Sequence, residues 1–418
     1  MNDKKSRFKS ILLAGKLLLA AGLLVWVLCK AHWNDYIKLT SQAGGQTLSV
    51  VSGKIPADSE GKVSAQSGML WWVKSREISL AQIEPVSQSD AGQKKIFIRK
   101  GIASIVTDCD KTLLIIATLL FPIVVILTAV RFWYLLSCQK IHITLGQSIR
   151  LTFLGQFFNM VVPGTVGGDL AKAWYINRHT KKTAEILMTV FLDRIIGLSE
   201  FVLMSAVMLS AVLLLGLVEF RLLKLPAIAV GCSAGAVVVA LTFLLSRRVR
   251  QMFHLEKIYS KLSIAHHFKA AGKSVLVYRK KPAILLWALL ITVGVHLCFI
   301  GAIALVGIAL GLQVPLWSYF IFLPLIYVIG AIPITPGGVG VVENLYLKFF
   351  SVALVSAVSP DASVIVALAM IARLLPVFWS LGGLWVLITG PKLPASDAMQ
   401  AQLDEDERIE EFTSETDQ

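Results

Sequence analysis

An apolar segment is interrupted by Asn159-Met-Val-Val-Pro163-Gly164-Thr-Val-Gly167-Gly168-Asp169, and a second one by Ile332-Pro333-Ile-Thr-Pro336-Gly337-Gly338-Val-Gly340, with Glu343 just after it. Proline removes a backbone donor and glycine adds flexibility, so a continuous helix is not expected through either stretch. In hydrocarbon, a broken backbone survives only where protein or a water-filled cavity satisfies its polar groups. Two breaks, each followed by a carboxylate, are typical of a transporter site.

The composition places the chain in the class of polytopic membrane proteins. Of its 418 residues 56% are hydrophobic and 16% charged, and the mean hydropathy is +0.72. A soluble protein carries about 25% charged residues. The net charge of +14 lies in basic blocks between apolar spans. Cytoplasmic loops of membrane proteins have this pattern, so we expect no nucleic-acid partner.

Apolar windows of about 20 residues give the expected spans. They cover residues 10–29, 112–135, 149–166, 184–218, 226–246, 282–311, 316–334, 338–358 and 361–389. The predicted fold is an all-α polytopic membrane protein. It has about six to eight transmembrane helices and two re-entrant or broken segments.

The same pass along the chain predicts its organisation. Residues 1–29 form an N-terminal transmembrane helix, and 30–111 form a small extracytoplasmic insertion, β-rich because β-formers alternate with Gly, Ser and Asp. Residues 112–390 form the main membrane domain, with a basic amphipathic segment at 246–281. Residues 391–418 form an acidic cytoplasmic tail that we expect to be disordered.

Loop charges give the expected orientation. The segment 246–281 holds ten Lys/Arg and the segment 131–182 holds seven, and the N-terminus is also basic. All three are therefore placed in the cytoplasm. The two breaks would then approach the membrane centre from opposite faces, which is the topology of an inverted repeat.

Asp169 and Glu343 are the first candidate site residues, because each acid follows a glycine cluster at the start of an expected helix. Either acid could cap its helix or stabilise it through the macrodipole. Either could also face a cavity and bind a cation, since acids inside a membrane are costly. The sequence leaves both roles open. Helix starts after Gly168 and Gly340 would also offer N–H groups to phosphate.

Charged residues inside later spans need partners elsewhere in the fold. Asp193 and Arg194 are adjacent and therefore do not face each other on a helix, and Arg373 lies in the last span. One arrangement pairs Asp169, Asp193 or Glu343 with Arg194 or Arg373. Such pairs could be structural salt bridges, or the guanidinium groups could bind phosphate. Asn159 could cap the broken segment or bind a substrate.

Sequence signatures of metal sites, cofactor sites and enzymes are not found. The five cysteines include no CxxC pair, and the seven histidines lack metal-ligand spacing. No nucleotide-binding loop or hydrolase motif is found either. We therefore expect no metal, no cofactor and no enzymatic activity.

The ordered motifs resemble a known family. They are Asn159-x3-Pro163-Gly164-x2-Gly167-Gly168-Asp169-x2-Lys172, Leu192-Asp193-Arg194-x2-Gly197, Pro333-x2-Pro336-Gly337-Gly338-x-Gly340-x2-Glu343 and Arg373-x2-Pro376. They look like the lysylphosphatidylglycerol synthase transmembrane region, also called the flippase-like domain family, over about 105–390. Lys172 stands where the family more often has arginine. No aminoacyltransferase domain follows, so that activity is not carried over.

The resemblance implies a multi-pass protein of the bacterial inner membrane that moves a phospholipid or lipid-linked molecule between leaflets. Its expected partners are anionic or lipid-linked substrates. A homo-oligomer and an envelope-biogenesis partner bound through residues 40–101 stay open. The alternatives are an ion-coupled transporter of a small solute and a non-catalytic partner of an envelope-assembly enzyme. The expected substrate-binding residues are Asn159, Pro163, Gly164, Gly167, Gly168, Asp169, Lys172, Asp193, Arg194, Pro336, Gly337, Gly338, Gly340, Glu343 and Arg373.

Overall fold

The structure is a computed structural model. It describes residues 101–161, 167–180, 182–245, 281–332, 334–351 and 361–390, together with Tyr278 and short pieces between residues 18 and 79. The expected N-terminal helix, the amphipathic segment at 246–281 and the tail at 391–418 lie wholly or largely outside these residues.

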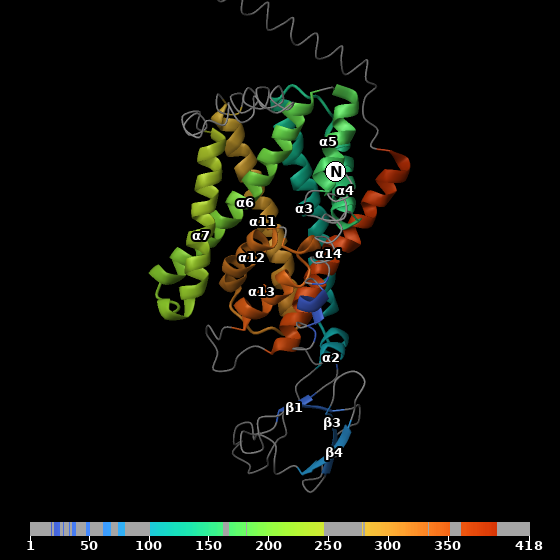
Figure 1. The fold of residues 1–418 in the computed structure, drawn as a ribbon, viewed down its shortest axis with the longest axis vertical. Helices are drawn as coiled ribbons and strands as arrows, with labels where there is room; N and C mark the ends of the chain where they lie inside the picture. The colour runs from blue at the N-terminus through green and yellow to red at the C-terminus, as the bar shows by residue number, and fades with distance from the viewer. Residues whose placement is uncertain are drawn as a thin grey trace, which may run out of the picture.

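The described chain is mostly helical (Figure 1). Its helices are α2 (Ile102–Thr107), α3 (Lys111–Cys138), α4 (Leu145–Val161), α5 (Gly167–Thr180), α6 (Thr183–Leu214), α7 (Phe220–Leu245), α11 (Pro282–Ala309), α12 (Leu316–Gly330), the 3₁₀ turn η3 (Pro336–Gly338), α13 (Val341–Phe350) and α14 (Ala362–Thr389). Two long helices have side-chain caps at their starts. Asp110 accepts hydrogen bonds from the backbone at the start of α3, and Asp361 does so for α14.

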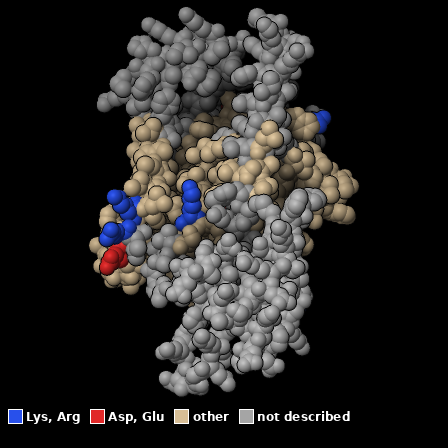
Figure 2. All heavy atoms as spheres, turned by 60° about the horizontal axis from the view of Figure 1, so that its bottom comes forward, with Lys and Arg blue, Asp and Glu red and all other residues tan. Residues whose placement is uncertain are grey.

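Four of these helices are long and apolar enough to cross a membrane, namely α3, α6, α11 and α14. Two shorter apolar helices lie in α7 and α12. The predicted number of six to eight spans stays a prediction. The described surface is rich in exposed leucine, isoleucine and tryptophan side chains. Figure 2 shows few charged groups on the part of this surface that faces the viewer. Such a surface suits contact with lipid.

Each expected break separates two helices. The first lies between the end of α4 at Val161 and the start of α5 at Gly167. The second lies between α12 and α13, where the backbone of Gly337, Gly338 and Gly340 has φ angles of 62°, 67° and 80°. Only glycine adopts these angles without strain, which explains the glycine cluster at this turn.

The described helices form two units of the same kind. One unit is α3–α6 and the other is α11–α14, and each consists of a long helix, a helical hairpin at the break and a second long helix. The units pack reciprocally, since α4 lies on α14, α12 lies on α6, and α3 lies on α11.

The two units run in opposite directions. The Asp110 N–H at the start of α3 donates to the Ala309 carbonyl at the end of α11, at 3.1 Å. The Arg150 guanidinium near the start of α4 likewise donates to the Gly390 carbonyl after α14, at 3.0 Å. The α4/α5 hairpin and the α12/α13 hairpin therefore enter the bundle from opposite ends (Figure 1).

Four strands lie within the segment 30–111. They are β1 (Tyr36–Lys38), β2 (Thr47–Val50), β3 (Lys62–Ser67) and β4 (Lys74–Ser79), and they pair in this order as an antiparallel sheet. The helix α2 begins at Ile102 and packs on α14. The extracytoplasmic position of this segment stays a prediction.

Candidate functional site

A cavity of about 360 Å³ lies beside the first hairpin. Side chains of α3, α4, α5, α6, α11 and α12 line it. Its polar lining residues are Thr128, Arg131, Thr152, Gln156, Asn159, Asp169, Lys172, Asp193, Arg194, His296 and Tyr327. The cavity therefore brings the first motif together with residues from both units of the fold.

Asp169 is the central carboxylate of the cavity and is only 3% exposed. It is the third residue of α5 and accepts a hydrogen bond from Arg194 Nε of α6. Lys172 Nζ lies 3.2 Å from its other oxygen and also stands over the Phe132 ring. Asp169 is thus held by two cations. Among the described residues, no backbone N–H donates to its carboxylate. The Arg194 side chain is 44% exposed, unlike those of its partners.

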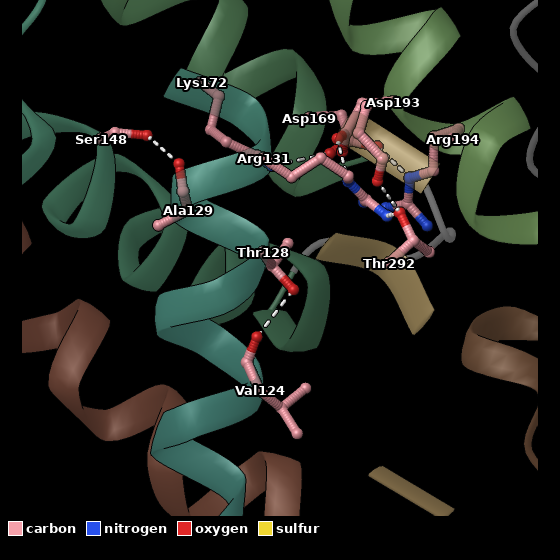
Figure 3. A network of polar contacts seen from close by, with 11 residues as sticks. Val124, Thr128, Ala129, Arg131, Ser148, Asp169, Lys172, Asp193, Arg194 and Thr292 are labelled. Atoms are coloured by element: carbon pink, nitrogen blue, oxygen red, sulfur yellow. Dashed lines mark hydrogen bonds and ion pairs between the residues drawn. The ribbon is translucent and has the colours of Figure 1, made fainter. Parts of the chain in front are cut away.

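A second buried ion pair lies next to the first (Figure 3). Arg131 Nε of α3 donates to Asp193 Oδ1 of α6 at 2.7 Å, and Arg131 Nη1 donates to Thr292 Oγ1 of α11 at 3.0 Å. The lining thus holds three cations and two carboxylates. With a neutral His296, its formal charge is +1.

Aromatic side chains form the remaining wall of the cavity. The rings of Phe201 and His296 stack at 3.7 Å, and Phe299 meets Tyr327 edge-on at 4.9 Å. His296 is 4% exposed, and its Nδ1 has no hydrogen-bond partner in the described part of the chain. The Tyr327 hydroxyl lies 3.3 Å from the Tyr346 hydroxyl of α13. The cavity therefore reaches from the first hairpin to Tyr327 of the second.

Close backbone contact shapes the first hairpin. A Cβ added to Gly168 would lie 1.8 Å from the Gly155 carbonyl oxygen of α4. The Gly168 N–H donates to Asn159 Oδ1 at 2.8 Å. Asn159 therefore ties the end of α4 to the start of α5, and glycine is required where the two helices meet.

The second hairpin repeats this plan, but its glycine turn and α13 do not line the cavity. Glu343 Oε2 accepts a hydrogen bond from the Gly340 N–H at 2.7 Å, so the side chain caps α13. Glu343 Oε1 accepts one from Arg373 Nε, and Arg373 Nη1 donates to the Gly337 carbonyl at 3.1 Å. Both Asp169 and Glu343 are thus the third residue of their helices and are bound by an arginine of the following long helix.

The family comparison agrees with this architecture. A family model described as the lysylphosphatidylglycerol synthase TM region matches residues 99–383, which is more than half of the chain. The chain belongs to this family. No curated protein and no solved structure matches it. The match contains both hairpins and all fifteen expected site residues, and it confirms the family that the motifs indicated over about 105–390.

Two of the expected pairings are present in this family region, and one residue has another partner. Arg194 binds Asp169 and Arg373 binds Glu343. Asp193 instead binds Arg131, which the sequence analysis did not single out. Arg131 was counted at the end of a span, whereas α3 continues to Cys138 and buries it.

The cavity collects only part of the expected set of site residues. Asn159, Asp169, Lys172, Asp193 and Arg194 line it. The residues of the second motif do not, and Gly167 and Gly168 support it from the hairpin backbone. Pro163 and Gly164 lie outside the described residues.

Other lining residues were missed, and some of them carried no signal in the sequence. Thr128, Thr152, Gln156, Phe201, His296, Phe299 and Tyr327 were not expected. A histidine within a long apolar span was the one signal that could have indicated His296. Among the described residues, no three His, Cys, Asp or Glu side chains are grouped to hold a metal ion.

Proposed function

We propose that the chain moves a phospholipid or lipid-linked molecule between the leaflets of a bacterial inner membrane, with the polar head group passing through the cavity. The observation that carries this proposal is a charged cavity within a bundle of apolar helices. Ionisable groups inside a membrane are costly and mark substrate or ion pathways. Membership of the family supports a lipid-related role.

In this proposal, each hairpin is a re-entrant element, and the two hairpins enter the membrane from opposite faces. The basic N-terminus and the basic segments 131–182 and 246–281 would lie in the cytoplasm, following the positive-inside rule. The opposite directions of the two units support this placement. A hairpin tip near the bundle centre would give a head group a polar path while acyl chains stay in lipid.

Arg194 is the residue that we expect to meet the phosphate first. Three cations line the cavity, namely Arg131, Lys172 and Arg194, and the Arg194 guanidinium is the most exposed of them. Arginine also offers a planar donor fork for phosphate. The N–H groups of Gly168 and Gly340 donate to Asn159 and Glu343, so they do not serve this contact in the structure. The proposal includes no covalent step, in keeping with a non-enzymatic role.

The test is a leaflet assay in proteoliposomes of the full chain. Fluorescent phospholipids that cross to the outer leaflet are quenched by an impermeant reductant. In liposomes with wild-type protein, the reductant should quench well beyond the one half of the label that starts in the outer leaflet. The Asp169→Asn/Arg194→Ala double variant should slow this transfer at least tenfold, because it removes the exposed guanidinium and its carboxylate partner.

A matched control carries the same kinds of substitution outside the cavity. The control is the Asp361→Asn/Arg221→Ala double variant. Asp361 caps α14, and asparagine can still provide this cap, while Arg221 is an exposed residue of α7. This variant should transfer lipid at the wild-type rate. Wild-type protein that transfers lipid no faster than the Asp169→Asn/Arg194→Ala variant would refute the proposal for the lipids used.

A further inference from the structure

Glu200 is a buried carboxyl group that takes no part in the ion pairs of the bundle. It lies near the middle of α6, seventeen residues after Thr183 and fourteen before Leu214. The residue is 3% exposed. Its Oε2 is buried without a hydrogen-bond partner, and no cation binds the side chain in the described part of the chain.

The position of this group is costly unless it serves a purpose. Glutamate is almost never fully buried without a partner, and an ionised carboxylate in apolar surroundings costs far more than an unmade hydrogen bond. The carboxyl group of Glu200 therefore holds a proton in this structure. Unpaired acids inside membrane helices are typical of ion and proton pathways.

Glu200 lies beside the wall of the cavity rather than in it. Gly197, Leu198 and Phe201 of the same helix line the cavity. Helical side chains lean towards the N-terminus and residues three apart are neighbours, so Glu200 lies over the turn of Gly197. A Cβ added to Gly197 would lie 3.6 Å from Arg131 Nη1. No side chain at position 197 therefore separates the turn of Glu200 from this polar wall.

The charged and titratable groups of the neighbouring helices leave Glu200 unpaired. On α6 itself, Asp193 binds Arg131 and Arg194 binds Asp169. On α7, residues 225–245 include no charged residue. The groups at this level on the other helices bind one another or stack on Phe201, and they are Arg131 of α3, Asp169 and Lys172 of α5, His296 of α11 and Tyr327 of α12.

We propose that Glu200 binds and releases one proton in each transport cycle, so that transfer through the cavity is coupled to a proton gradient. The inference rests on the proposed function for the cargo, and it adds the coupling ion and its binding residue. In the structure the carboxyl group holds the proton. When the two units rearrange, the carboxylate binds the Arg131 guanidinium and the proton passes to water in the cavity.

The surroundings of Glu200 suit a proton better than a metal ion. Hard cations such as Ca²⁺ and Mg²⁺ are held by six or more oxygen ligands. Between residues 195 and 204, Ser199 is the only other residue with a side-chain oxygen, and its Oγ is also buried without a partner in the described chain. No group of three His, Cys, Asp or Glu is found among the described residues. A proton needs a single carboxyl oxygen.

The first test locates the proton with dicyclohexylcarbodiimide on the full chain in liposomes. This apolar reagent adds to protonated carboxyl groups, and mass spectrometry of peptides locates the adduct. We expect an adduct at Glu200 and none at Asp169 or Asp193, whose carboxylates bind cations. Labelling of Glu200 should be strong at acidic pH and fall at alkaline pH, because the released form does not react. Absent labelling would overturn the inference, and so would equal labelling at both pH values, which marks a permanently protonated structural group.

The second test imposes a pH difference across the proteoliposomes of the leaflet assay. A difference of about two pH units corresponds to about a hundredfold equilibrium ratio for one proton, so the wild-type transfer rate should change at least about threefold. Glu200→Gln resembles the protonated form and cannot release a proton, so its transfer rate should not respond. Glu200→Asp keeps an ionisable group and should keep part of the response.

Two controls separate coupling from a structural role. Glu219→Gln makes the same change at an exposed position between α6 and α7 and should respond to the gradient as wild type does. Glu200→Gln and Glu200→Leu should unfold in detergent at the wild-type temperature or above, because a buried polar group without a partner contributes no stability. Lower unfolding temperatures for both variants would show that the carboxyl group holds the bundle together and would overturn the inference.

The outcomes also distinguish this inference from the proposed function. Labelling of Glu200 that depends on pH, without leaflet transfer of any lipid, would contradict only translocation. Leaflet transfer by wild-type protein that does not respond to the gradient would contradict only proton coupling.

Discussion

At the residue scale, the buried ion pairs connect helices that are far apart in the sequence. Asp193 and Arg131 are both 6% exposed and join α6 to α3. Removing two charges from water is expensive, and their attraction offsets this cost only when further hydrogen bonds complete the pair. Thr292 supplies such a bond to Arg131 from α11. The pair therefore fixes three helices around the cavity.

Removing one member of this pair should destabilise the protein more than removing both. Arg131→Met leaves Asp193 without its bound cation in a buried site, which should cost about 3–5 kcal/mol of unfolding free energy. The Arg131→Met/Asp193→Leu double variant should recover most of that loss, because no charge is left unpaired. Unfolding temperatures in detergent measure both. A double variant less stable than Arg131→Met would contradict this account.

The sequence could indicate these residues only in part. Asp193, Arg194 and Arg373 were recognisable because charges inside apolar spans need partners, and two expected pairings are present. Arg131 was not recognised, since an arginine followed by aromatic residues also suits the end of a span. The contribution of Phe201 and His296 depends on how α6 and α11 face each other, and helical periodicity in such uniformly apolar segments does not give that orientation.

At the element scale, each hairpin depends on glycines for a different physical reason. Gly168 allows α5 to approach the backbone of α4 at Gly155. Gly337, Gly338 and Gly340 instead supply positive φ angles between α12 and α13. The first hairpin is therefore sensitive to any side chain at the contact. The second is sensitive to residues that resist the left-handed region.

Gly168→Ala should open the first hairpin. Its methyl group would lie 1.8 Å from the Gly155 carbonyl oxygen, a backbone atom that cannot rotate away. We expect a lower unfolding temperature and a loss of lipid transfer of at least tenfold, because the start of α5 carries Asp169. The unfolding temperature is measured in detergent, and lipid transfer is measured in liposomes.

Gly231→Ala is the matched control for this change. Gly231 lies within α7, and an added Cβ there would have no heavy atom within 4 Å. Alanine favours a helix over glycine by about 1 kcal/mol, so this variant should be as stable as wild type or more stable, with unchanged transfer. If Gly168→Ala behaves in the same way, the close contact does not hold the hairpin.

The two breaks were the elements that could be predicted best from the sequence. Proline and glycine act on their own backbone, so Gly167-Gly168 and Pro336-Gly337-Gly338 indicated helix ends without knowledge of the fold. Helix lengths were less certain, and α3 extends three residues beyond the expected end at 135. Packing decides such ends, because the buried final turn of α3 contacts neighbouring helices rather than an interface.

At the scale of the whole molecule, the reciprocal packing of the two units gives the proposed translocation a mechanical basis. The helix α4 lies on α14 and α12 lies on α6, so each hairpin rests on the long helix of the other unit. The cavity lies at the first hairpin, and Tyr327 connects it to the second. Rocking of one unit against the other would close the cavity at one hairpin and open an equivalent one at the other.

A cross-link between the units should therefore stop transfer, whereas one within a unit should not. Ser205 Oγ of α6 donates to the Ile321 carbonyl of α12 at 3.0 Å, so Ser205→Cys/Ile321→Cys places a cysteine pair at a contact between the two units. Thr183 Oγ1 donates to Asn177 Oδ1 at 2.8 Å, so Asn177→Cys/Thr183→Cys joins α5 to α6 within one unit. Both pairs are placed in a chain whose five native cysteines are replaced by alanine. Oxidation should abolish leaflet transfer by the first pair, reductant should restore it, and the second pair should be unaffected. Undiminished transfer with the units cross-linked would show that the lipid passes without relative motion of the two units.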